Sequence, residues 1–443
     1  MHTGTINIMG GGLLQLVAYG AQDAYLSGNP QITFWKGLFK RHTNFAMEPF
    51  RVNFTGQATW GTRHSAVVGR NADLLYTTYL EVTLPTGAFN NDQGRLGYNL
   101  IKYVELTIGG QSIDRLYGEW MYLWDSLTSD VWTSKKLWNM VGGGPNTLYL
   151  TTSNSVSTFT NPASCNSGSG KPSLPNTLYI PLAFFYTRNP GAALPLIALQ
   201  YHEVKIDILW NDAQLIAGDF TAASALKQPI NAAIYIDYIY LDVEERRRMA
   251  QESHEYLIEQ VQFSEDKGIS SYNNRIDLTF NHPVKELVWV VQPSEYRTCK
   301  GPQGSRSSAT RLQPFTYDLE TCYTQKIQIN GQDRMDVRYG DYFNQPQMYQ
   351  HHTGLGATLQ STTSLPTHQG GIFMYSFALR PEEHQPSGTC NFSRIDTATI
   401  VMDISGEIVV DESIDRTLGV RVYAVNYNIL RIMSGMAGLA YSN

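Results

Sequence analysis

Residues 13–51 read LLQLVAYGAQDAYLSGNPQITFWKGLFKRHTNFAMEPFR, and this stretch sets the pattern for the rest of the chain. Its first part, residues 13–24, is apolar with few helix breakers, so it predicts a short helix or an extended arm. Residues 27–30 (SGNP) are turn formers. A β-type run rich in aromatic side chains follows at residues 32–39. The stretch therefore predicts an N-terminal arm, residues 1–26, then a sharp turn and the first strand of a β domain.

Composition points to a large β protein. The chain has 443 residues, more than one ordinary core supports, which predicts two domains. Its 27 tyrosines, 37 glycines and 19 prolines favour many short strands joined by tight turns. The net charge of -6 offers no basic face, so we expect no direct contact with nucleic acid. No secretion signal or membrane-spanning run is apparent, which predicts a soluble protein made in the cytosol.

Apolar runs predict strands along both halves of the chain. In the first half they fall at residues 50–54, 74–84, 100–109, 177–185, 201–210 and 234–242. In the second half they fall at residues 255–263, 275–280, 285–292, 325–330, 372–379, 397–404 and 420–432. The charged run VEERRRMAQES, residues 243–253, predicts an exposed linker, with one helical turn as the alternative, between domains at 27–242 and 254–443. Residues 141–176, rich in Gly, Ser, Thr, Asn and Pro, predict a long surface loop.

One segment, residues 113–128 (IDRLYGEWMYLWDSLT), departs from the β pattern. Its large apolar side chains recur at helical spacing: Leu116, Trp120, Leu123, Trp124 and Leu127. This spacing predicts a short amphipathic helix packed on the core. A ligand-stacking aromatic box is the alternative, and core packing is the favoured interpretation.

Two segments far apart in the chain repeat the same pattern. Each has a predicted strand and a hairpin turn, followed by a Gln, an Asp and the sequence Tyr-Gly-acidic-aromatic. The two copies are LTIGGQ (106–111), Asp114 and YGEW (117–120), and IQINGQ (327–332), Asp336 and YGDY (339–342). The closing strands agree too, with Ile-Asp-Tyr at 236–238 and Val-Asn-Tyr at 425–427. Two like halves of about eight strands each predict an all-β protein made of two consecutive eight-stranded antiparallel jelly rolls, with short helices in the loops.

No set of residues predicts catalysis, a cofactor or a metal site. A zinc-hydrolase motif fails at His254, because Ile258 stands where the second His is required. The pair His351 and His352 lies in a Gly/Thr-rich loop and is predicted to be solvated, and residues 381–384 (PEEH) favour a turn over a metal site. The four cysteines are scattered without a C-x-x-C pair, which predicts free thiols in a reducing compartment: Cys165, Cys299, Cys322 and Cys390.

Two N-x-S/T sequons, at Asn53 and Asn391, are candidate glycosylation sites. Both lie in or beside predicted strands, whereas glycans prefer exposed loops. We therefore expect neither asparagine to carry a glycan.

Several segments resemble one known family. They are QLVAYGAQD (15–23), GNPQITF (28–34), KRHTNFAMEP (40–49), DVEERRRMAQESHEYLIEQVQ (242–262) and PSGTCNFSRIDTATI (386–400). They resemble the major capsid proteins of large icosahedral DNA viruses, the nucleocytoplasmic group that includes chlorella-virus, iridovirus and mimivirus relatives. Lys40 and Pro49 are small departures from the family's RRHTNFAMES. The resemblance spans nearly the whole chain, apart from residues 141–176.

The resemblance implies a structural protein that acts by assembly. Its fold would be the double jelly roll, and three copies would form a pseudo-hexagonal capsomer in the outer capsid of the virion. The expected partners are two further copies, neighbouring capsomers and minor capsid proteins under the shell, with an internal membrane nearby and assembly in the host cytoplasm. The arm at 1–26 and the tail at 433–443 are expected to face the virion interior. The alternative is a double jelly-roll carbohydrate-binding or carbohydrate-active protein, which would need a cleft with convergent polar groups.

Overall fold

The structure is a computed structural model. It describes residues 11–441 apart from 36, 38, 85–95, 143–176, 213–229, 270, 295–314, 316, 318–320, 355–356, 359–366, 369 and 405–417. The predicted loop at 141–176 and its Cys165 therefore lie outside the described residues, except for residues 141 and 142. The chain divides into two units, Met1–Asn44 and Phe45–Asn443.

The first unit contains two short helices, α1 (Gly11–Val17) and α2 (Asp23–Ser27), which bury none of their side chains. Gly28 ends α2, and its N–H donates to the carbonyl of Ala24 at 2.9 Å. The strand expected at 32–39 is wrong for the described residues of that range, which form no strand. A strand needs a neighbour for its backbone groups, and the described residues of this unit offer none. The first strand of the chain instead begins at Phe45.

In its described residues, the first half of the second unit comprises nine strands. They are β1 (Phe45–Asn53), β2 (Arg63–Val67), β3 (Leu74–Thr83), β4 (Ile101–Ile108), β5 (Gln111–Tyr117), β6 (Thr177–Pro181), β7 (Leu194–Pro195), β8 (Val204–Trp210) and β9 (Asn231–Leu241). Its helices are α3 (Leu96–Leu100), α4 (Gly118–Thr128), α5 (Val131–Met140), α6 (Phe185–Arg188), η2 (Pro190–Ala192) and η3 (Leu196–Ala198). The strands form two antiparallel sheets, ordered β1-β9-β3-β6 and β2-β8-β4-β5, with β7 added to β3.

The second half follows α9 (Val243–Gln251). Its strands are β10 (His254–Ile269), β11 (Asn273–Leu278), β12 (Pro283–Pro293), β13 (Cys322–Ile329), β14 (Gln332–Asp333), β15 (Arg338–Tyr339), β16 (Ala357–Thr358), β17 (Thr367–His368), β18 (Ile372–Ser376), β19 (Cys390–Asn391), β20 (Ala398–Ile404), β21 (Leu418–Met433) and β22 (Met436–Leu439). Its helices are α10 (Gly340–Asn344), α11 (Pro346–His351) and η5 (Phe392–Arg394). The two main sheets are ordered β10-β21-β12-β18 and β11-β20-β13-β14.

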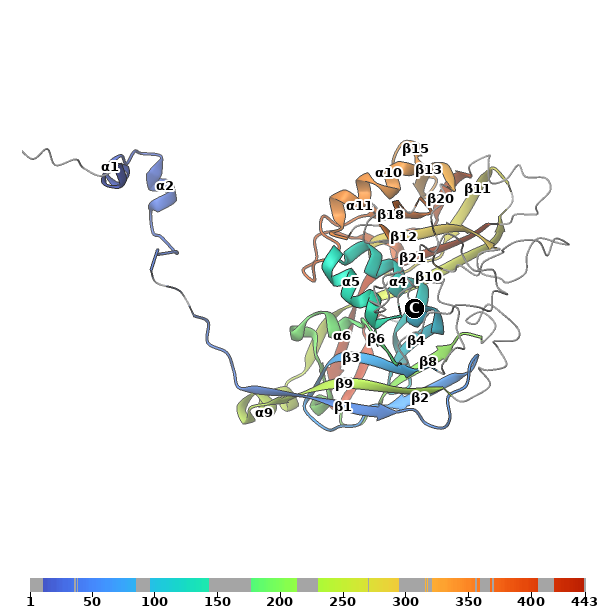
Figure 1. Ribbon diagram of the computed structural model, residues 1–443, viewed down its shortest axis with the longest axis horizontal. Coiled ribbons are helices and arrows are strands. Elements are labelled where there is room, and N and C mark those ends of the chain that lie inside the picture. The colour runs from blue at the N-terminus through green and yellow to red at the C-terminus, as the bar shows by residue number, and fades with distance from the viewer. Residues whose placement is uncertain are drawn as a thin grey trace, which may run out of the picture. The chain divides into compact units, whose positions relative to one another are not determined.

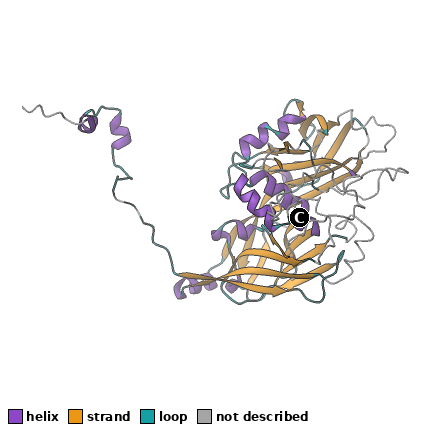
Figure 2. Ribbon diagram, viewed as in Figure 1, coloured by secondary structure: helices purple, strands orange, loops and turns teal. Residues whose placement is uncertain are grey.

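The two halves share one strand order. Eight strands lie in the two main sheets of each half, and we number them one to eight along the chain. In both halves, one sheet has the order first, eighth, third, sixth, and the other has the order second, seventh, fourth, fifth. Two such sheets packed face to face form a jelly roll. Figures 1 and 2 show the strands of the two halves gathered into two bodies, with α4 and α5 between them. The predicted all-β double jelly roll is confirmed.

The internal repeat is visible in the backbone. Both hairpins turn through two residues with positive φ, Gly109 and Gly110 in one half and Asn330 and Gly331 in the other. Positive φ at both central residues is what a two-residue type I′ hairpin turn requires. The twist of this turn matches the right-handed twist of the two strands that it joins. The Tyr-Gly step then starts a helix in each half, α4 at Gly118 and α10 at Gly340.

Several local predictions need correction. The helix expected over 113–128 begins only at Gly118, because residues 111–117 pair with β4 as strand β5. It is also buried on nearly every face, since it lies between the two halves. Strand 177–185 ends at Pro181. The Gly/Thr-rich loop expected around His351 and His352 contains α11, which ends at His351. The linker run 243–253 forms the nine-residue helix α9, which buries none of its side chains.

Two main clusters of buried apolar side chains hold the second unit together. The larger fills the first half and continues into the second through residues such as Ile258, Val288 and Tyr423. The smaller fills the second half around Trp289, Phe343 and Phe373. Because the larger cluster crosses between the halves, separating them would expose apolar core to water.

Candidate assembly surfaces and the interface between the two halves

The interface between the two halves begins where β5 lies along β10. The carboxylate of Asp114 accepts a hydrogen bond from the backbone N–H of Val261 at 3.4 Å. The Gln260 side chain donates to the carbonyl of Ile113. The ring of Tyr117 packs on that of Phe263, with centroids 4.7 Å apart. These contacts bury Asp114 to 5% exposure, and burial raises the pKa of its carboxyl to about 7.

A buried ion pair lies beside this contact. Oε2 of Glu119 on α4 accepts hydrogen bonds from Arg421 Nε and from the hydroxyl of Tyr423, both at 2.7 Å, and Oε1 accepts from the hydroxyl of Tyr317 at 2.6 Å. Arg421 also donates to Gln292 at 2.8 Å. Burial lowers the pKa of Arg421, but the attraction of the Glu119 carboxylate is stronger. The pKa of Arg421 therefore lies above its ordinary value.

A second set of buried charges surrounds Glu259 of β10. It pairs with Arg188 from α6 of the first half and with Lys285 of β12, whose Nζ lies 2.8 Å away. Lys285 is fully buried, and its Nζ also donates to the carbonyl of Pro381 at 2.6 Å. Burial would raise the pKa of Glu259, but the two cations hold it below the ordinary value. The guanidinium of Arg188 lies 4.8 Å from the ring centroid of Trp124, so α4 is part of this set.

His352 completes the polar interface. Its Nε2 lies 3.0 Å from Glu286 Oε2 and its Nδ1 lies 2.9 Å from Glu382 Oε1. The next two residues reach the end of α4 in the first half, where Thr353 Oγ1 donates to the Thr128 carbonyl at 3.2 Å and Gly354 N–H to the Leu127 carbonyl at 2.7 Å. The expectation that His352 is solvated is therefore wrong, because its side chain is fully buried. The local sequence around His352 is typical of a surface loop. Only the tertiary structure shows that this segment packs against α4.

These groups position the two halves. Every charge named here has an opposite charge or a hydrogen-bond partner, as buried charges require. Buried ion pairs add little net stability but penalise arrangements that would separate the partners. The interface therefore fixes how the two jelly rolls sit against each other. Within the repeat motif, Asp114 and Glu119 were singled out by sequence, whereas nothing local in the sequence marked Arg188, Lys285 or Arg421.

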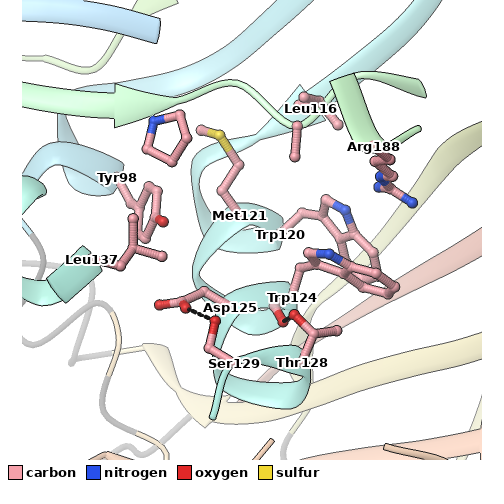
Figure 3. A pocket seen from close by; sticks show the side chains of 12 residues that line it. Tyr98, Leu116, Trp120, Met121, Trp124, Asp125, Thr128, Ser129, Leu137 and Arg188 are labelled. Atoms are coloured by element: carbon pink, nitrogen blue, oxygen red, sulfur yellow. Dashed lines mark hydrogen bonds between the residues drawn. The ribbon is translucent and has the colours of Figure 1, made fainter. Parts of the chain in front are cut away.

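The tryptophans of α4 belong to the core. Trp120 is 1% exposed, and its ring lies 5.6 Å from that of Trp124 and 5.4 Å from that of Tyr423. Figure 3 shows the cavity beside them, which measures about 100 Å³. Ligand pockets usually enclose roughly 300–1,000 Å³. The predicted core packing of these residues is confirmed.

A larger hollow of about 840 Å³ lies between the two halves, lined by residues from β4, α4 and β21. Asp212 and Ser294 also line it, and both adjoin segments outside the described residues. Within the described residues, no group of three or more His, Cys, Asp or Glu side chains could hold a metal ion. Cys322 and Cys390 are free thiols, while Cys299 lies outside the described residues. Among the described helices, none combines the length and apolar character that crossing a membrane requires.

The two sequons lie at strand ends. Asn53 is the last residue of β1 and is exposed. Asn391 is exposed on β19, where its side-chain oxygen accepts a hydrogen bond from Ser393 N–H at 3.0 Å. The Ser393 hydroxyl accepts in turn from His282 N–H at 2.8 Å. The second sequon therefore serves as a local cap in the fold.

Comparisons with known proteins agree with this architecture. A family model described as "Major capsid protein N-terminus" matches residues 33–242, and one described as "Large eukaryotic DNA virus major capsid protein" matches residues 245–438. The major capsid protein of Pyramimonas orientalis virus is 45% identical, and that of Phaeocystis pouchetii virus 42%, each match covering 98% of this chain and all of the relative. Among solved structures, a quasi-atomic model of the PBCV-1 virus capsid matches with TM-score 0.71 and 32% identity, covering 93% of this chain and 100% of that one.

The fold and the interface thus define a double jelly-roll viral coat protein. The two viral relatives named above are both major capsid proteins, and each is matched over its whole length. The chain belongs to the family of major capsid proteins of large eukaryotic DNA viruses. It is the major capsid protein of a large icosahedral DNA virus, a structural component of the virion and not an enzyme.

Proposed function

We propose that three copies of the chain form a homotrimeric capsomer of pseudo-hexagonal outline, and that such capsomers tile the outer shell of the particle. The observation that carries this proposal is the shared strand order of the two halves. Three copies of a chain with two like jelly rolls present six similar bodies around one axis. Such a unit can pack against six neighbours with similar contacts, which is how closed shells use one protein many times.

The proposal extends to the partners of the shell. The arm at 1–26 and the tail at 433–443 face the interior, where minor capsid proteins and an internal membrane would meet them. The net charge of -6 supports a shell protein that does not touch the genome itself. Assembly would take place in the host cytoplasm.

We also propose that the chain divides into domains at 27–242 and 254–443, joined by residues 243–253. The two family models support this division, because one ends at residue 242 and the other begins at 245. Limited proteolysis tests it: the first cuts should fall in 243–253 or in 141–176. Early cleavage inside β4 or β20 would contradict the division.

The sequons are proposed to stay unmodified, since one closes a strand and the other caps a turn. Intact-mass measurement of protein taken from particles tests this directly. A hexose-bearing mass at Asn53 or Asn391 would overturn it.

The trimer is tested by size-exclusion chromatography with light scattering on the full-length protein. The expected mass is three times that of the 49.7 kDa chain, and it should not change on dilution into the low-micromolar range. A monomer at every concentration would reject the proposal. Negative-stain imaging of the same fraction should show particles with a roughly hexagonal outline.

A further inference from the structure

The hollow of about 840 Å³ between the two halves has the size of a ligand pocket, since such pockets enclose roughly 300–1,000 Å³. It also lies at a boundary between two folded bodies, where ligand pockets are common. The described residues that line it combine aromatic rings with charged and amide side chains. The chemistry of this lining indicates which class of molecule fits it.

Three half-buried rings line the hollow and run from one jelly roll to the other. Tyr103 of β4 and Tyr117 of β5 are paired across their sheet, with ring centroids 6.4 Å apart. The ring of Tyr117 in turn lies 4.7 Å from that of Phe263 on β10 of the second half. Val104 and Leu116, which alternate with the two tyrosines, point into the core and are at most 1% exposed. The tyrosines therefore lie on the outer face of the sheet, where a molecule in the hollow can contact them.

Two buried N–H groups of the lining are left for a further partner. Trp210, at the end of β8, is 1% exposed, and its indole Nε1 has no hydrogen-bond partner in the described part of the chain. The side chain of Arg421 is 3% exposed. Its Nε donates to Glu119 and its Nη2 to Gln292, which leaves Nη1 for another acceptor. Because buried polar groups are nearly always paired with protein, water or ligand, both N–H groups are donors for an occupant of the hollow.

Gly419 keeps the space beside this guanidinium open. It precedes Arg421 by two residues on β21 and also lines the hollow. A Cβ at position 419 would lie 3.3 Å from Arg421 Nη1, which is a crowded contact. A side chain here would therefore fill the space in which an acceptor atom of a bound molecule can approach Nη1.

The charges of the lining disfavour two classes of ligand. The charged residues among those that line the hollow are Lys102 and Arg421, which are positive, and Glu119, Asp212 and Glu265, which are negative. Two positive and three negative charges sum to -1, so the lining does not attract a strongly anionic ligand such as a phosphate. A purely apolar ligand would leave the two buried N–H groups unpaired, which costs free energy. The ligand that fits is neutral and carries both donors and acceptors.

We propose that the hollow binds a neutral oligosaccharide. A pyranose ring has a face of C–H groups that packs on the negative face of an aromatic ring, and its hydroxyls both donate and accept hydrogen bonds. The sugar rings pack on Tyr103, Tyr117 and Phe263. The hydroxyl oxygens accept from Trp210 Nε1 and Arg421 Nη1. This binding activity goes beyond the proposed capsomer and does not depend on the trimer.

Saturation-transfer NMR on the full-length protein tests the proposal with three neutral trisaccharides, namely maltotriose, cellotriose and chitotriose. At least one of them should bind with a dissociation constant below about 1 mM. Trigalacturonic acid, which is of similar size but carries carboxylates, should bind about tenfold more weakly or less. If no neutral trisaccharide gives a signal at about 10 mM, or if trigalacturonic acid binds more tightly than all of them, the proposal is wrong.

Two variants locate the binding. Tyr103→Ala removes one stacking surface and Gly419→Ala crowds Arg421 Nη1, and each should raise the dissociation constant about tenfold. Tyr179→Ala is the matched control, because Tyr179 is a 45% exposed tyrosine on β6 that is not part of the lining. It should bind the trisaccharide as the wild type does. Melting temperatures show which variants fold, and either of the first two suffices for the test. Wild-type affinity in a folded Tyr103→Ala or Gly419→Ala protein would place the saccharide elsewhere and overturn the site.

Discussion

Arg421 Nε lies 2.7 Å from Glu119 Oε2, although 302 residues separate them in the chain. Both side chains are almost fully buried, at 3% and 5% exposure. The pair joins β21 of the second half to the first turn of α4 in the first half. A shift of one jelly roll against the other would therefore separate two buried charges and destabilise the fold.

Glu119→Ala should destabilise the protein strongly. The substitution leaves the Arg421 charge buried without its carboxylate and removes the acceptor of Tyr317 and Tyr423. Breaking one side of a buried pair typically costs about 3–5 kcal/mol of unfolding free energy. Urea unfolding followed by tryptophan fluorescence measures it.

The control for this substitution is Glu383→Ala, which breaks the exposed pair with Arg380. Exposed pairs contribute roughly 0–1 kcal/mol, so this variant should unfold almost as the wild type does. Equal unfolding midpoints for the two variants would show that Glu119 is not part of the stabilising interface.

Stability should depend on pH through His352. Burial lowers the pKa of this imidazole, but Glu286 and Glu382 outweigh burial and raise the pKa to about 9. The folded state therefore holds the proton more tightly than the unfolded chain, whose histidine titrates near 6.5. The stabilisation is complete below about pH 6.5 and is lost as the pH rises through about 9, an effect of up to roughly 3 kcal/mol.

Melting temperatures between pH 6 and pH 10 measure this dependence. The wild type should lose stability across the upper part of the range, and His352→Gln should lose much less. His351→Gln is the matched control, because the His351 side chain is only partly buried and its ring nitrogen Nδ1 lies 3.2 Å from a backbone carbonyl, that of Leu379, and not from a carboxylate. A wild-type slope that persists in His352→Gln would assign the dependence to another group.

Gly118→Ala and Gly340→Ala should each destabilise the half that contains them. A Cβ at Gly118 would lie 2.3 Å from the carbonyl oxygens of Tyr98 and Ile101, and one at Gly340 would lie 2.3 Å from that of Cys322. Backbone must move to relieve such contacts, at a cost of about 1–3 kcal/mol or more. Gly191→Ala, whose Cβ would meet no atom closer than 3.6 Å, should be close to neutral in the same thermal melt.

Deleting residues 1–24 should leave folding and trimer formation intact and prevent shell assembly. Helix α1 carries Leu13, Leu14 and Leu16, and none of its side chains is buried. An apolar segment left outside a core needs a partner to cover it, and we expect that partner elsewhere in the particle. Melting temperature and trimer mass should match those of the full chain, while electron microscopy shows no particles.

The same deletion has an outcome that contradicts this expectation. If the truncated protein melts at a clearly lower temperature or falls to monomer, the arm is part of the folded core. The boundary of the arm at residue 26 would then be wrong.

Much of the architecture followed from local patterns in the sequence. Strands such as β3, β8 and β20 lie where apolar periodicity predicted them, because a strand's alternation records which of its faces is buried. The repeated hairpin followed by Tyr-Gly could also be recognised in the sequence, because local backbone geometry restricts its residue types. The turn needs Gly or Asn at positive φ, and the glycine after Tyr lies against a carbonyl that leaves no room for a side chain.

The tertiary structure alone decided where strands find partners and where charges are buried. The aromatic run at 32–39 has strand character, but no strand among the described residues pairs with it, so the described part of the run stays irregular. His352 looks solvated in its loop, yet the fold encloses it between Glu286 and Glu382. Local sequence reports periodicity and turn chemistry over a few residues. The burial of Arg421 against Glu119 depends on packing between segments 302 residues apart, and no local pattern encodes it.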